Sequence, residues 1–259
     1  MNTNPKPKHR SAFTLVELLA TVAIITLLVA IAAPALRSAR VAAQKARETH
    51  AAHQLINAYT MYYTEHDGRL LPGYRQGFPA TDRFNNPLGH PVGTRYPYRL
   101  APYLEYNLHD SILVGQRSLQ VLDAEVTGIE PTYSISIAPS FGLNATFLGG
   151  NQNNFAPYVT KADNVFTPNR MLVFVSSRGG NFDDDIRGYH EVRPPITANF
   201  EPTSMPFEFG FNYPKYNNHA VAAHLDGHVD LLSDQQLYQI DRWSDNAARG
   251  LNPYQLYPN

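Results

Sequence analysis

The sequence predicts an α+β protein in which a long N-terminal helix, transmembrane in its first half, packs on a small antiparallel β-sheet head. Three observations predict this class. Residues Phe13 to Leu36 form an almost uninterrupted apolar run, and residues 37–66 contain helix-forming side chains without Gly or Pro. Further along, Asp226-Gly227 separates two short segments of alternating polarity, which is typical of a β-hairpin.

The apolar run is long enough to cross a membrane as a helix, since about 20 apolar residues span the hydrocarbon layer. Residues 1–12 carry basic side chains and no acid, so we expect a cytoplasmic leader there and a membrane segment at 13–36. A secretory signal peptide is the alternative, although its apolar core is usually shorter. Basic residues also follow the span, so charge counting leaves the orientation open.

Glu17 is the only ionisable residue within the apolar run. A carboxylate one turn inside a lipid-facing helix costs about 2 to 3 kcal/mol on insertion scales. The sequence therefore predicts that Glu17 lies near the interface, is protonated, or has a specific partner.

The helix is expected to continue through residues 37–66 as an amphipathic segment, bent at Pro34 because proline removes a backbone hydrogen bond. Its later turns carry apolar residues three and four positions apart, which predicts that residues 51–66 dock on a sheet. Asp67-Gly68 is a helix-ending signal. We expect a globular α+β head at 67–259.

Within the head, short apolar runs predict strands at 111–114, 133–138 and 170–176. A proline-rich and glycine-rich segment at 71–102 predicts a long packing loop. Residues 234–243 predict a short amphipathic helix with Ser233 as its cap.

The turn at Asp226, Gly227 and His228 is expected to be a two-residue type I′ turn, because glycine tolerates the positive φ that this turn demands. In that register His224 faces Val229. His224 then points away from His219 and His228, so the three histidines are not expected to hold a metal.

Composition excludes several classes of function. A net charge of -1 argues against nucleic-acid binding, which needs a basic surface, and the absence of Cys excludes disulfides and thiol chemistry. No common catalytic or nucleotide-binding motif is present, so we expect no enzyme activity. Asp183 and Asp185 have the spacing that begins a calcium loop, but the rest of an EF-hand is missing, which leaves a looser calcium site open.

The stretch Ala12-Phe13-Thr14-Leu15-Val16-Glu17-Leu18-Leu19 resembles the N-terminal signal of type IV pilins and type II secretion pseudopilins. Pro34 also lies where that family has its helix-kinking proline. The resemblance implies cleavage between Ala12 and Phe13 by a prepilin peptidase, then methylation of the new Phe13 amine. It further implies that Glu17 pairs with the Phe13 amine of a neighbouring subunit. Ala12 stands where the family usually has glycine.

Two further stretches resemble a group of large pseudopilin-like proteins from planctomycetes and verrucomicrobia. Residues 95–107 are similar to that group's "LLPYLE" stretch, and the Asp226-Gly227 hairpin is similar to its C-terminal H-X9-DG element. Tyr216 occupies the position of the element's His. Some major pseudopilins bind calcium in a C-terminal loop, which agrees with the loose site at Asp183 and Asp185.

These resemblances imply a structural subunit, assembled with other pilin or pseudopilin subunits into a type II secretion pseudopilus or a type IV pilus-like filament. Its expected location is the bacterial inner membrane, with a single span and the head outside the cytoplasm, and later the filament. The alternative is a membrane-anchored binding or enzymatic domain that does not assemble.

Overall fold

The computed structural model describes residues 14–115, 131–151, 156–177, 188–194 and 216–254 of the 259-residue chain. The chain divides into two compact units, Met1–Ala43 and Gln44–Asn259. Helix α1 (Leu15–Glu65) is continuous, and Pro34 does not interrupt it. The helix ends where expected, because Asp67 and Gly68 both have positive φ.

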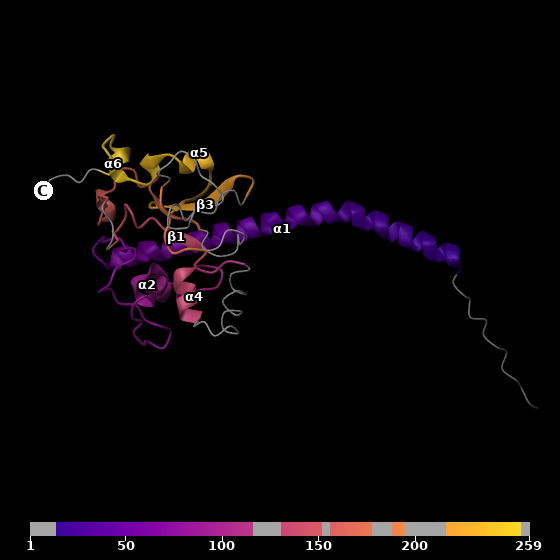
Figure 1. The fold of residues 1–259 in the computed structure, drawn as a ribbon, viewed down its shortest axis with the longest axis horizontal. Coiled ribbons are helices and arrows are strands. Elements are labelled where there is room, and N and C mark those ends of the chain that lie inside the picture. Colours follow the sequence, from indigo (N-terminus) through magenta and orange to yellow (C-terminus); the bar gives the residue numbers. More distant parts are fainter. Residues whose placement is uncertain (1–13, 116–130, 152–155, 178–187, 195–215, 255–259) are drawn as a thin grey trace, which may run out of the picture. The chain divides into compact units, whose positions relative to one another are not determined.

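The second unit contains a four-stranded antiparallel sheet in the order β1-β2-β3-β4 (Figure 1). The strands are β1 (Phe141–Leu143), β2 (Leu172–Ser176), β3 (His219–His224) and β4 (Val229–Ser233). Short helices accompany them: α2 (Tyr96–Leu100), α4 (Pro131–Ile137), α5 (Asp234–Leu237) and α6 (Asp245–Ala248), with 3-10 turns at Val92–Thr94, Ala101–Leu104, Ala162–Asn164 and Ile240–Arg242. The α+β class predicted from the sequence is confirmed.

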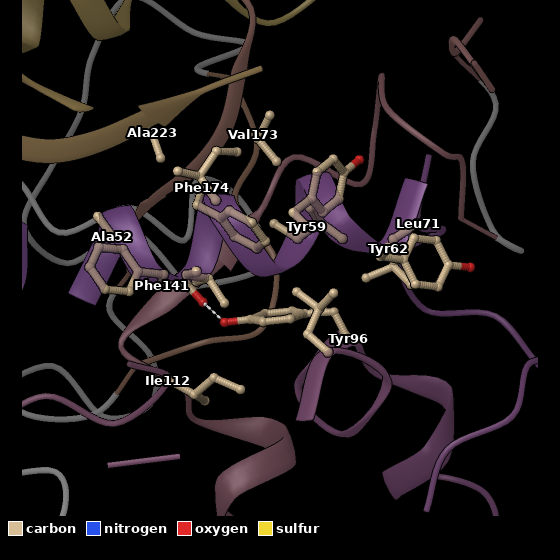
Figure 2. Close-up of a cluster of buried hydrophobic side chains, with 14 of the residues drawn as sticks. Ala52, Tyr59, Tyr62, Leu71, Tyr96, Ile112, Phe141, Val173, Phe174 and Ala223 are labelled. Carbon is tan, nitrogen blue, oxygen red and sulfur yellow. Dashed lines mark hydrogen bonds between the residues drawn. The ribbon is translucent and has the colours of Figure 1, made fainter. Parts of the chain in front are cut away.

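The last turns of α1 pack on one face of the sheet, as expected. Tyr59 contacts Phe174 of β2 edge-to-face, with ring centroids 5.6 Å apart, and Tyr96 meets the same ring at 5.3 Å. Figure 2 shows these rings with Val173, Ala223 and the Tyr96 hydroxyl, which donates to the Phe141 carbonyl at 2.7 Å. Aromatic pairs of this kind add about 0.5–1.5 kcal/mol each beyond their buried area.

A second apolar cluster covers the opposite face of the sheet. Leu172 and Ala222 contribute from the strands, and Leu237 and Trp243 from the C-terminal segment. Trp243, the only tryptophan of the chain, is fully buried and donates its indole N–H to the Leu237 carbonyl at 2.9 Å. The sheet is therefore covered on both faces.

The long loop after α1 is organised by a buried arginine. The Arg99 guanidinium donates to the carbonyls of Pro72 and Gly73 at 3.0 Å each, to Gly93 at 3.1 Å and to Arg75. Arg99 is only 3% exposed, so these carbonyls replace its hydration. Residues 71–91 form the packing loop that their composition predicted, whereas residues 92–102 were wrongly predicted as loop, since they contain the 3-10 turn Val92–Thr94, α2 and the start of the turn Ala101–Leu104.

Two of the predicted strands are wrong. Residues 133–138 lie mostly in α4, where Pro131 provides a helical first residue with its φ already fixed. Arg95 holds that helix, donating to Ser136 at 2.8 Å and lying over the Tyr133 ring. Residues 111–114 form a turn, in which the N–H groups of residues 112 and 113 both donate to the Leu108 carbonyl.

The predicted helix at 234–243 is broken in two. Gln239 has a φ of -77° and a ψ of 103°, which separates α5 from the 3-10 turn Ile240–Arg242. The prediction that Ser233 caps the helix is confirmed. The Ser233 hydroxyl accepts a hydrogen bond from the Gln236 backbone N–H at 3.4 Å, and the Gln236 side-chain oxygen accepts one from the Ser233 backbone N–H at 2.9 Å.

Candidate functional site

The N-terminus of α1 is closed by a reciprocal pair of side chains. Glu17 Oε2 accepts from both the backbone N–H and the hydroxyl of Thr14, each at 2.9 Å, and the Thr14 hydroxyl accepts from Glu17 N–H at 3.2 Å. This is a capping box, which satisfies donors that a helix start leaves unpaired. Glu17 therefore has a partner in its own chain. Ala12 and Phe13 lie outside the described residues.

The first part of α1 is apolar around its whole circumference. Every residue from 14 to 47 is exposed, including the large apolar side chains between Leu15 and Leu36. By length and composition this helix could cross a membrane. A helix without a polar face needs an apolar environment on all sides, such as lipid or other apolar helices. Pro34 lies within this stretch.

Glu48 is the first buried residue of α1, and it was not among the site residues predicted from the sequence. It is 1% exposed; Oε1 accepts from the Ser176 hydroxyl at 2.5 Å, and Oε2 accepts from the Tyr216 hydroxyl. These bonds join α1 to β2 and to Tyr216, which lies three residues before the start of β3. Tyr216 therefore contacts the helix.

The hairpin between β3 and β4 differs from the predicted two-residue turn. His224 N–H donates to the His228 carbonyl at 2.9 Å, and Gly227 N–H donates to the His224 carbonyl at 3.0 Å. The loop therefore contains three residues, 225–227. Gly227 has a φ of 96°, whereas Asp226 does not have a positive φ. This arrangement is a type I turn followed by a left-handed glycine.

This change of register reverses the prediction for the histidines. His224 lies opposite His228 rather than Val229, and their rings stack with centroids 4.0 Å apart. Asp230, two residues further along the same face, brings Oδ2 to 3.3 Å from His228 Nε2. His228 Nδ1 lies 2.5 Å from Asp226 Oδ1. The prediction that these two histidines diverge was wrong.

His224 is fully buried, and burial, followed by the nearby His228, lowers its pKa to about 4. Its imidazole is therefore neutral at neutral pH and keeps a lone pair. His228, Asp226 and Asp230 are partly exposed. His219 does not belong to this cluster: its Nδ1 lies 2.8 Å from the Asn217 carbonyl oxygen.

A second buried polar group lies at His190 and Glu191. Burial, then Arg95 and Arg193, lowers the pKa of His190 to about 3. Burial raises the pKa of Glu191, and Arg193 opposes that shift. Glu191 Oε1 accepts from the Asn151 side chain at 2.6 Å. These residues stabilise a junction of loops and were not predicted, because nothing in their local sequence marks them as buried.

Asp183 and Asp185, the residues of the predicted loose calcium site, lie outside the described residues. The structure therefore leaves that site as a prediction.

Comparison with known proteins finds a similarity at the N-terminus. Residues 7–33 match the family model of the prokaryotic N-terminal methylation motif. No curated protein and no solved structure matches the chain. The motif supports a type IV pilin-like protein that is processed by prepilin peptidase and associated with the membrane, and it favours a structural subunit over an enzyme.

Proposed function

We propose that the chain is a structural subunit of a type II secretion pseudopilus or a type IV pilus-like filament. The observation that carries the proposal is the N-terminal methylation motif at 7–33, lying on a helix that is apolar on every side. The proposed location before assembly is the inner membrane, with a single span and the head outside the cytoplasm. The proposed partners are prepilin peptidase and other pilin or pseudopilin subunits.

In this proposal, cleavage between Ala12 and Phe13 releases the basic leader and creates an amine one residue before the helix cap. Glu17 Oε2 is occupied by Thr14, while Oε1 takes no bond from any residue that the structure describes. That oxygen is available to the Phe13 amine of a neighbouring subunit. Pairing removes the cost of an isolated carboxylate in an apolar environment, so it favours one register between subunits.

The processing step is tested by intact mass and N-terminal peptide analysis of membrane-extracted protein, from cells with and without a prepilin peptidase. We expect a chain that begins at methylated Phe13 only when the peptidase is present. Ala12→Gly should be cleaved and Ala12→Leu should keep the leader, because the site requires a small residue. A chain that still begins at Met1, or that is cut near Ala33, would support an ordinary anchor or signal peptide instead.

The assembly step is tested by separating the charge of Glu17 from its capping role. Glu17→Gln keeps an oxygen for the capping box but removes the charge, whereas Thr14→Val removes the capping hydroxyl and keeps the charge. The subunits in membrane fractions are cross-linked chemically, so that assembled chains give a ladder of oligomers on a gel. We expect prepilin peptidase to cleave both variants, and only Glu17→Gln to lose this ladder. Equal ladders from wild type and Glu17→Gln would contradict the pairing role.

A further inference from the structure

The most unusual polar feature of the described residues is the end of the β3-β4 hairpin. Three potential ligand side chains, His224, His228 and Asp230, bring their donor atoms within 4.8 Å of one another. His224 is 0% exposed, and neither ring nitrogen has a well-aligned hydrogen bond with a described residue, although the Arg170 backbone lies close enough to act on the ring. A buried polar group without a partner costs about 1–3 kcal/mol, which calls for an explanation.

We propose that this hairpin end binds one divalent transition-metal ion, with Zn²⁺ as the best match, through His224, His228 and Asp230. Two imidazoles and one carboxylate are ligands that zinc accepts, with an open fourth position for water. Calcium and magnesium prefer sites made of oxygen ligands, so they fit this set poorly.

The hydrogen bonds around the cluster already select which ring nitrogens can act as ligands. Asp226 Oδ1 lies 2.5 Å from His228 Nδ1, so this nitrogen carries the proton and Nε2 presents its lone pair. Nε2 is the nitrogen that lies 3.3 Å from Asp230 Oδ2. The backbone carbonyl of Arg170 lies beside the His224 ring, where it can accept from one nitrogen and leave the other as a ligand.

Metal binding requires the His228 ring to tilt out of its stack on His224, because two parallel rings 4.0 Å apart cannot both direct an in-plane lone pair at one ion, and it requires a contraction of the cluster. Tetrahedral ligands bound to zinc at ~2.0–2.1 Å are about 3.3 Å apart, compared with separations of up to 4.8 Å here. The His228 side chain is 38% exposed and the Asp230 side chain 57%, so both can rotate toward His224 without repacking the core.

The charges near the hairpin end favour a cation on balance. Asp226 and Asp230 supply two carboxylates, and Arg242 is the cation that acts on both His224 and Asp230. Arg170 is engaged by Asp241 at 2.7 Å. A divalent ion therefore meets two negative groups and one positive group.

The test uses the full-length protein in detergent, purified with an affinity tag that contains no histidine. Zn²⁺ is titrated in competition with a chromophoric chelator, and Co²⁺ serves as a spectroscopic probe of coordination geometry. We expect one high-affinity ion per chain, a visible tetrahedral Co²⁺ absorption, and at least tenfold weaker binding in both His228→Gln and Asp230→Asn. The same titration with Ca²⁺ should show no binding at this site.

His219→Gln is the matched control, because His219 is on the same hairpin and outside the cluster. It should bind Zn²⁺ like the wild type. Trp243 fluorescence verifies that each variant is folded, including His224→Gln, which loses a buried group. The proposal fails if the wild type binds Zn²⁺ no more tightly than His228→Gln, or if His219→Gln weakens binding as much as the cluster variants do.

Discussion

Replacing Tyr216 with phenylalanine tests whether the buried bond to Glu48 holds the helix to the sheet. The substitution keeps the ring and removes one hydroxyl. Glu48 and Tyr216 are 1% and 6% exposed, so water has little access to replace the lost bond. Losing one hydrogen bond to a buried side chain costs about 1–3 kcal/mol. For a folded unit of this size, that loss lowers the Tm by about 2–12 °C.

Trp243 provides the readout, because it is the only tryptophan and lies buried on the sheet face opposite Tyr59 and Phe174. Its fluorescence follows unfolding of the head even when detergent covers the apolar helix. Tyr158→Phe is the control: its side chain is 39% exposed, so losing that hydroxyl should change the Tm by less than about 1 °C.

A double-mutant cycle separates the bond from other effects of the substitution. Glu48→Gln and Tyr216→Phe are measured singly and together, and residues in contact should show a coupling of at least about 0.5 kcal/mol. Strictly additive effects, or a Tyr216→Phe protein as stable as the Tyr158→Phe control, would refute the role assigned to this bond.

Three other predictions concern the head. Gly149→Ala should destabilise the head by more than about 2 kcal/mol, because the new Cβ would lie 2.2 Å from the Leu71 carbonyl oxygen and the residue has a φ of +66°. Gly227→Ala should cost about 1 kcal/mol, because its φ is +96° but the space around it is open. Denaturant unfolding compares the stability of the two variants. Arg99→Lys should cost about 2–3 kcal/mol and speed proteolysis of the loop after α1, because an ammonium cannot reproduce the planar set of bonds to four carbonyls. His190, whose pKa is lowered to about 3, stays neutral in the folded state while the unfolded chain takes up a proton below about pH 6.5. Stability should therefore fall with decreasing pH between those values by up to about 1.4 kcal/mol per pH unit, and His190→Gln should flatten that slope in unfolding titrations.

The sequence predicts well wherever a periodic pattern and a local signal agree. The apolar run, the helix stop at Asp67-Gly68 and the alternating strands of the hairpin all satisfy this condition, and each is found in the structure. Residues 133–138 show the limit, because their alternation suits a strand while contacts with Arg95 stabilise a helix. Tertiary contacts decide such short segments.

Features that join distant parts of the chain could not be predicted. Glu48 lies on a helix rich in charged residues, and its partner Tyr216 is 168 residues away. The histidine cluster was missed for a different reason. Asp226-Gly227 is compatible with both a two-residue and a three-residue loop, since each places a glycine at positive φ. Local sequence does not choose between them, yet the choice decides which side chains meet.

The three-residue loop of the hairpin also constrains how relatives of this chain can vary. Because side chains alternate between the two faces of a strand, a loop shortened by one residue would turn every side chain of β4 over. Leu232, now 1% exposed, would leave the apolar cluster around Trp243, and Asp230 would turn with it to the face on which α1 packs. Natural variation at residues 225–227 should therefore occur by substitution, while single-residue deletions there should be rare.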